Sequence, residues 1–142
     1  MAAKTYNKFQ QFVEDLSKGV HNLSTGSITV ALCAAAHAPV ATNKVLADLT
    51  EIAYTYCSSR VATVSSCAQT GGTLKLILAD LTLTASGGAV GPFEYLVFYN
   101  ATPTNPLKPL ICWYDYGSEI TLADGESLLI DLDNVNGILQ IA

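Results

Sequence analysis

The amino-acid sequence predicts an all-β protein, an antiparallel, jelly-roll-like β-sandwich of about eight strands with a short N-terminal helix or arm. Between residues 73 and 142, runs of about four to eight residues rich in valine, isoleucine, leucine and aromatic residues alternate with turn-forming stretches. Breakers such as Ser86-Gly87-Gly88 and Asn136-Gly137 separate these runs. Regular spacing of short strands and turns is typical of a two-sheet sandwich.

The length of 142 residues predicts a single domain over residues 1–142. Half of the residues are apolar and 13% are charged, against about 25% in ordinary soluble domains. Two interpretations fit this low charge. Either a partner or a second copy covers part of the surface, or the exterior is rich in alanine, serine and threonine.

The net charge of −5 and the scattered basic residues argue against nucleic-acid binding, which needs a stripe of neutralising cations. No apolar run reaches the roughly 18 residues that span a bilayer, so we expect no membrane insertion. The N-terminus lacks an apolar segment after its first lysines, and we therefore expect no signal peptide.

The first predicted element is a helix of about three turns over residues 5–18, within an N-terminal helix or arm at residues 1–22. Its apolar residues recur at helical spacing: Phe9, Phe12, Val13 and Leu16. Thr5 is the expected cap and Gly19 the expected stop. A strand is the alternative, since two of these residues also fit a period of two. Such a short segment must pack on the sandwich or on a neighbouring subunit.

The remaining elements follow from runs of β-branched and aromatic residues bounded by breakers. A helical turn or two is expected within residues 44–52. Residues 101–108, with Pro103 and Pro106, are long enough for an exposed loop. Strands are expected over residues 27–33, 60–66, 73–79 with a continuation through 81–84, 92–100, 109–116, 119–122, 127–131 and 138–141.

Residues 92–100 form the strongest predicted strand. Strict alternation would place Phe93, Tyr95, Val97 and Tyr99 on one face and Leu96 and Phe98 on the other. Both faces are therefore substantially apolar. Either a helix or loop of this chain covers the second face, or a neighbouring subunit does, because tyrosine and tryptophan suit interfaces.

No constellation typical of catalysis or metal binding is evident, and we expect a non-enzymatic protein with no cofactor and no metal. His37 follows Cys33 by four residues, but this segment leaves a strand, which is the wrong geometry for a metal. The stretch from Asp131 to Gly137 has the glycine one residue late for a calcium loop, and a polar turn explains it. Asp115 and Glu119 are the closest candidates for the carboxylate pair of a glycosidase.

The four cysteines show no metal-binding spacing, and the absence of a secretory signal argues against disulfides. Cys33 and Cys112 lie in apolar runs and are expected in the core. Cys57 and Cys67 flank a polar stretch and could meet across a hairpin, so their pairing stays open.

Several turn-and-strand signatures resemble those of a known class of viral proteins. They are Gln69-Thr70-Gly71-Gly72-Thr73, Gly91-Pro92-Phe93-Glu94-Tyr95, Trp113-Tyr114-Asp115-Tyr116-Gly117 and Leu122-Ala123-Asp124-Gly125-Glu126. From about Phe9 onward the chain resembles the capsid decoration, or cement, proteins of tailed bacteriophages. This resemblance implies a small β module on the outside of the virion. It also implies synthesis in the host cytoplasm and binding to the major capsid protein and to further copies, as a dimer or trimer.

The predicted contact regions are the N-terminal segment and the loop of residues 101–108. Their residues are Tyr6, Phe9, Phe12, Thr102, Pro103, Asn105, Pro106 and Lys108. Alternatives are a phage tail or fibre component and a carbohydrate- or receptor-binding module, with Trp113 or exposed tyrosines as stacking platforms. A glycosidase that uses Asp115 and Glu119 is the remaining rival.

Overall fold

The computed structural model describes residues 5–142 and confirms the all-β class, with nine strands and one α-helix in this range. The first four residues of the predicted arm lie outside the described residues. The jelly-roll-like connectivity stays a prediction. The elements are β1 (Thr5–Lys8), α1 (Gln10–Ser17), β2 (Ile28–Cys33), β3 (Val64–Thr70), β4 (Thr73–Leu78), β5 (Leu81–Thr84), β6 (Val90–Asn100), β7 (Leu110–Leu122), β8 (Ser127–Ile130) and β9 (Leu139–Ile141), with short 3-10 helices at Ala35–His37 and Leu46–Asp48.

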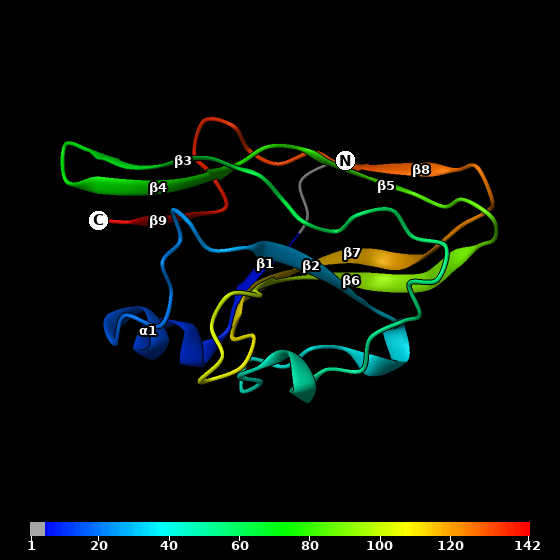
Figure 1. The fold of residues 1–142 in the computed structure, drawn as a ribbon, viewed down its shortest axis with the longest axis horizontal. Helices are drawn as coiled ribbons and strands as arrows, with labels where there is room; N and C mark the ends of the chain where they lie inside the picture. The colour runs from blue at the N-terminus through cyan, green and yellow to red at the C-terminus, as the bar shows by residue number, and fades with distance from the viewer. Residues whose placement is uncertain (1–4) are drawn as a thin grey trace.

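The strands form two layers. One layer is an antiparallel sheet in the order β1-β7-β6-β2, and the other contains the sheets β3-β4-β9 and β5-β8. Figure 1 shows the second layer above the four-stranded sheet, with α1 and the segment of residues 34–52 below it. The molecule is therefore sandwich-like, with an extra covering on the outer face of the larger sheet.

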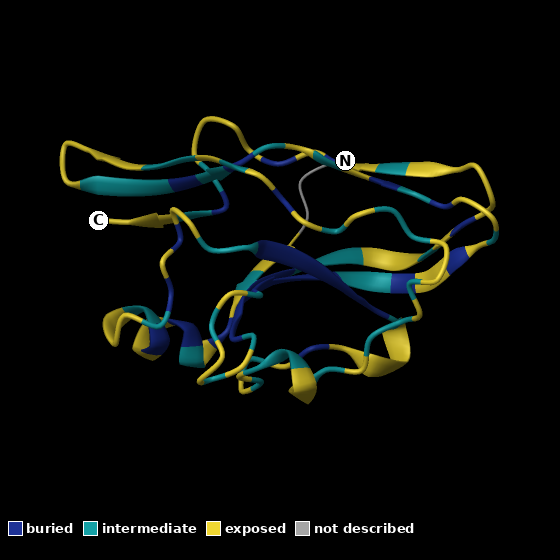
Figure 2. Cartoon of the chain, in the orientation of Figure 1, coloured by how far each residue is buried: buried dark blue, intermediate teal, exposed yellow. Residues whose placement is uncertain are grey.

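The main core lies between the two strand layers. The interior side of β6 supplies Phe93, Leu96 and Phe98, and the smaller sheets supply residues such as Leu76 and Leu83, all fully buried. Figure 2 shows that buried residues concentrate along β2, β6 and β7, whereas the hairpin tips are exposed. Burial of large side chains of this kind stabilises the fold by about 1.5–3 kcal/mol each.

A second apolar cluster occupies the opposite face of the four-stranded sheet. Val97 and Trp113 are buried there, and Leu46 and Leu49 from the segment of residues 34–52 pack against them. The chain itself therefore covers this face, which decides between the two interpretations of the aromatic strands. A neighbouring subunit does not dock directly on these side chains.

The N-terminal prediction was half wrong. Residues 5–8 form strand β1 on the edge of β7, and α1 begins only at Gln10. Phe9, not Thr5, precedes the helix, and its backbone is extended. Tyr6 packs edge-on to Tyr114 at a centroid distance of 5.4 Å, so the strand gains an aromatic cross-strand pair. The predicted stop at Gly19 fits a backbone with φ +76° immediately after the helix.

Four strand predictions need correction. The strand expected over residues 60–66 is displaced, because residues 60–62 bond to the edge of β2 and β3 begins only at Val64 and runs to Thr70. Leu81–Thr84 does not continue β4 but pairs with β8 in a separate sheet, after Asp80 accepts a hydrogen bond from the Leu132 amide. The residues 119–122 belong to the long strand β7. Phe93 shares the interior face with Leu96, because the β6–β7 register shifts between Phe93 and Tyr95. A bulge of this kind reverses the alternation on which the prediction depended.

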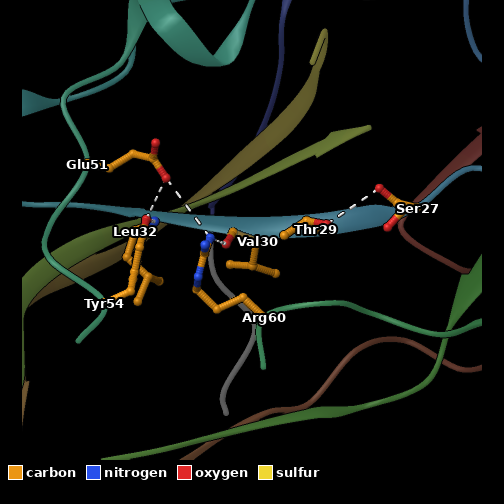
Figure 3. Close-up of polar contacts among 7 residues, drawn as sticks. All are labelled: Ser27, Thr29, Val30, Leu32, Glu51, Tyr54 and Arg60. Carbon is orange, nitrogen blue, oxygen red and sulfur yellow. Dashed lines mark hydrogen bonds and ion pairs between the residues drawn. The ribbon is translucent and has the colours of Figure 1, made fainter. Parts of the chain in front are cut away.

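The free edge of β2 is closed by residues of the segment that follows the covering loop. The Val30 amide donates to the Arg60 carbonyl at 2.9 Å, and the Leu32 amide donates to the Tyr54 hydroxyl at 2.9 Å. The Arg60 guanidinium lies 3.6 Å from the centre of the Tyr54 ring and donates to the Val30 carbonyl. Figure 3 shows these side chains along β2. These N–H and C=O groups of β2 therefore have hydrogen-bond partners and are not free to pair with a strand of another molecule.

All four cysteines are free thiols, so Cys57 and Cys67 do not pair. Cys33 and Cys112 are buried as expected, and burial raises the pKa of both thiols, to about 11 and about 12. Within residues 5–142, no helix has the length and apolar character needed to cross a bilayer.

Candidate functional site

The structure brings part of the predicted contact loop against α1 and the segment around Val45. We call the surface formed by α1, residues 44–49 and the loop of residues 101–108 the contact surface. These three segments are far apart in sequence, but they lie together below the four-stranded sheet (Figure 1). The contact surface is thus a product of the fold and not of one contiguous motif.

Backbone hydrogen bonds hold the loop of residues 101–108 in place. The Lys108 amide donates to the Pro103 carbonyl at 3.2 Å, and the Leu46 amide donates to the Lys108 carbonyl at 2.9 Å. Lys108 has φ +51°, a left-handed conformation that costs a non-glycine residue about 1–2 kcal/mol. These two bonds keep the residue in this conformation, so the loop is preorganised for binding.

The segment of residues 44–49 has its own internal clamp. One carboxylate oxygen of Asp48 accepts hydrogen bonds from the Lys44 amide at 2.8 Å and the Val45 amide at 3.1 Å. Both bonds lower the pKa of Asp48 below its ordinary value, and the bond from the Lys44 amide contributes most. The carboxylate is therefore occupied in shaping a turn, and the lysine side chain that precedes it is left for solvent or a partner.

Two adjoining hollows, which share Val45, mark the contact surface. The first has a volume of about 500 Å³ and lies between α1, Asp48 and the loop residues Asn105 and Pro106. The second has a volume of about 320 Å³ and lies between Leu46, Leu49 and Leu107. Leu107 is 57% exposed at the rim of the second hollow. Lys108 and Glu51 also line this second hollow. An exposed leucine beside an apolar hollow with charged residues at its rim is a typical arrangement for protein contacts.

A buried polar cluster supports the start of the loop. The side-chain amide of Asn100 donates to Nδ1 of His21 at 3.3 Å, and its oxygen accepts a hydrogen bond from the Thr102 amide at 3.1 Å. Nδ1 is thus an acceptor, and neutral His21 carries its proton on Nε2. Nε2 and one oxygen of the buried Asp15 have no hydrogen-bond partner within residues 5–142. Burial lowers the pKa of His21, while Asp15 partly opposes this shift.

The predicted contact residues divide into those on the surface and those in the core. Thr102 and Asn105 are exposed, and Pro103, Pro106 and Lys108 are half-buried in the same loop. Thr102 also accepts a hydrogen bond from the Ser27 amide at 2.9 Å, which ties the loop to the start of β2. The loop half of the prediction therefore lies where a partner can reach it.

Phe9 and Phe12 are core residues, which corrects the expectation that their rings face a partner. Phe9 is completely buried, with its ring centre 4.5 Å from that of Trp113. Phe12 is buried between the layers, and its ring centre lies 5.2 Å from that of His21. Tyr6 remains exposed, but it lines a separate groove between β1, α1 and β9.

The structure corrects one feature proposed for the rival functions, the stacking role of Trp113, and shows the surroundings of the two carboxylates. Trp113 is buried beneath Phe9 and offers no stacking platform for a sugar ring. Asp115 accepts a hydrogen bond from the Gly117 amide at 2.7 Å, and Glu119 accepts one from the Ala35 amide at 3.1 Å. A third carboxyl group, that of Glu94 on β6, interacts with Asp115. The pKa of Glu94 is raised mainly by desolvation and next by the hydrogen bond and the charge of Asp115.

Sequence reasoning missed Leu107, which is exposed, and the half-buried Val45 and Leu46 as residues that line the contact surface. The sequence held two signals for them. Leu107 is an apolar residue between Pro106 and Pro109, and Val45 and Leu46 are an apolar pair in a segment expected to be helical. Among residues 5–142, no cluster of three or more histidine, cysteine or acidic side chains has metal-binding geometry. Comparisons with protein-family models, with curated proteins and with solved structures find no match.

Proposed function

We propose that this protein is a non-enzymatic structural component of a phage virion that decorates the capsid. It would bind the outer surface of the major capsid protein through the contact surface. The observation that carries the proposal is the preorganised loop of residues 101–108, which presents Leu107 beside an apolar hollow on a rigid sheet. The sequence resemblance to decoration proteins supplies the identity of the partner.

The physical logic of such a protein is linkage. Each copy would bury a modest area, but a bound copy favours the assembled shell over its separated subunits. A copy that contacts two adjacent shell subunits gains further from the high effective concentration of the second site. A β-sandwich that holds its contact loop by backbone hydrogen bonds loses little conformational entropy on binding.

The test uses shells assembled from the major capsid protein of the phage that encodes this chain. Purified protein should sediment with these shells in a saturable manner. Leu107→Asp should weaken binding by about tenfold or more, because a buried leucine contributes about 1.5–3 kcal/mol and a charge opposes burial. Leu129→Asp is the matched control, because Leu129 is 47% exposed on β8 in the other strand layer.

If Leu107→Asp bound the shells as tightly as the wild type, the contact surface would not be the site that binds the capsid protein. No sedimentation with shells, combined with recovery of the chain in tail fractions, would favour the tail or fibre alternative. Recovery on immobilised glycans without shell binding would favour a receptor-binding module. Thermal melting of both variants should match that of the wild type, because both positions are exposed.

A further inference from the structure

The groove beside β1 is an open side of the sandwich. It has a volume of about 610 Å³ and lies between β1 of one layer, β9 of the other layer and α1. Both strands end their sheets, since the orders are β1-β7-β6-β2 and β3-β4-β9. Two strand edges therefore border one groove, which shares no lining residue with the two hollows of the contact surface.

The floor and walls of this groove are apolar. Phe12, Leu16 and Leu139 belong to or pack against the main core, and they reach the groove from α1 and β9. Tyr6, Val13 and Ile141 also line it, and each is at least 40% exposed. These three account for a third of the nine large apolar side chains that are exposed in residues 5–142. Such concentration at one place indicates a docking site.

The backbone of β1 defines the shape of the occupant. The Phe9 amide donates a hydrogen bond to the Ile111 carbonyl, and two residues earlier Asn7 lies opposite Trp113. In an antiparallel pair every second residue bonds to the neighbouring strand, so Asn7 and Phe9 bond to β7. The N–H and C=O groups of Tyr6 and Lys8 consequently point away from β7. Within residues 5–142 they have no hydrogen-bond partner, in contrast to the closed edge of β2. An added strand would satisfy them.

The charge of the groove defines the chemistry of the occupant. Lys8 is the sole charged side chain among the lining residues in the described part of the chain. None of the described carboxylates forms an ion pair with it. An occupant that carries a carboxylate near Lys8 would therefore gain a charge-assisted contact, which a basic occupant would lose.

We propose that the β1 groove binds an extended segment of a partner protein that adds as a strand to β1, alternates apolar side chains into the groove and places a carboxylate beside Lys8. This interaction goes beyond the contact surface, because the groove uses other residues of α1 and none that line the two hollows there. It stands whether or not the partner of the contact surface is a capsid protein.

The probe is a synthetic hexapeptide, acetylated and amidated, that alternates valine and threonine around one glutamate. Added at millimolar concentration to the full-length protein, it should slow hydrogen exchange at the Tyr6 and Lys8 amides by about tenfold or more, as measured by NMR. A peptide with alternate N-methylated amides should lose this effect, because it lacks the donors for strand pairing. Replacing the glutamate by lysine should weaken binding.

Two variants give the matched controls. Val13→Asp places a charge in the groove and should abolish peptide binding, whereas Val61→Asp should bind normally, since both valines are 50% exposed and Val61 lies outside the groove. Lys8→Glu should reverse the preference and favour the lysine peptide. Melting temperatures of all three variants should match that of the wild type.

Several outcomes would overturn the inference. Equal binding of the N-methylated peptide would exclude strand addition, and failure of the glutamate peptide to protect either amide would exclude the site. Protection that appears without peptide and rises with protein concentration would assign the groove to a second copy. If Lys8→Glu still preferred the glutamate peptide over the lysine peptide, the peptide carboxylate would have no role in recognition.

Discussion

The substitution Phe9→Ala tests whether the N-terminal aromatic residues support the fold or face a partner. Phe9 is fully buried against Trp113, on the outer face of the four-stranded sheet. Removing a buried phenylalanine ring typically costs about 3–5 kcal/mol, because apolar burial is lost and a cavity remains. A domain of this kind has a total stability of about 5–15 kcal/mol, so the loss is a large part of it.

The expected shift in melting temperature follows from the size of the chain. An unfolding entropy of about 2.1 cal/mol/K per residue gives about 0.3 kcal/mol/K for 142 residues. A loss of 3–5 kcal/mol therefore lowers the melting temperature by about 10–17 °C. Differential scanning calorimetry measures this shift, and urea titration at constant slope measures the free energy of unfolding independently.

The matched control is Val13→Ala, which truncates an exposed residue of α1 and should change stability by no more than about 0.5 kcal/mol. The reasoning is refuted if Phe9→Ala melts within about 2 °C of the wild type. This result would mean that the ring is free of the core and available to a partner, as the sequence pattern alone suggested.

Three further predictions follow from local geometry. Gly137→Ala should destabilise the protein by more than about 2 kcal/mol, because Gly137 has φ +77° and a Cβ there would lie 2.2 Å from the Leu76 carbonyl oxygen. Gly71→Ala, with φ +59° and open space, should cost only about 1 kcal/mol in the same urea titration. Tyr54→Phe should cost about 1–2 kcal/mol in calorimetry, since a buried amide loses its acceptor. Burial lowers the pKa of His21 below its ordinary 6.5, so the unfolded chain binds this proton first. The contribution of neutral His21 to the free energy of unfolding is therefore complete above about pH 6.5 and is lost as the pH falls toward the folded pKa. Urea titrations at pH 7 and at about pH 5.5 should show a decline in the free energy of unfolding that His21→Asn lacks.

Much of the fold could be predicted from the sequence, because β-branched runs and turn residues act locally. The strands around Val30, Leu76 and Phe98 are where the patterns placed them. The errors arose where tertiary pairing overrode local periodicity. The spacing of Phe9 and Phe12 fits a helix, but pairing with β7 extends the chain up to Phe9 and sends the two rings into different clusters. The irregularity beside Phe93 had a local signal in Gly91 and Pro92, because a glycine and a proline inside a strand are typical of bulges, but strict alternation took no account of it.

The candidate sites were harder to predict, because both are assembled from distant segments. The loop around Leu107 was recognised from its prolines, but its neighbours on α1 and near Val45 follow only from the packed structure. The β1 groove depends on which strands end each sheet. Sheet order is set by non-local pairing, and neither periodicity nor composition reports it.

The most direct test of the central claim is the number of copies of this chain per virion, measured by quantitative mass spectrometry on purified particles of the phage that encodes it. We predict a copy number in fixed proportion to the major capsid protein, with Leu107 protected from hydroxyl-radical labelling in the particle and reactive in the free protein. Absence from the particles, or a few copies confined to the tail with Leu107 still reactive, would contradict the account.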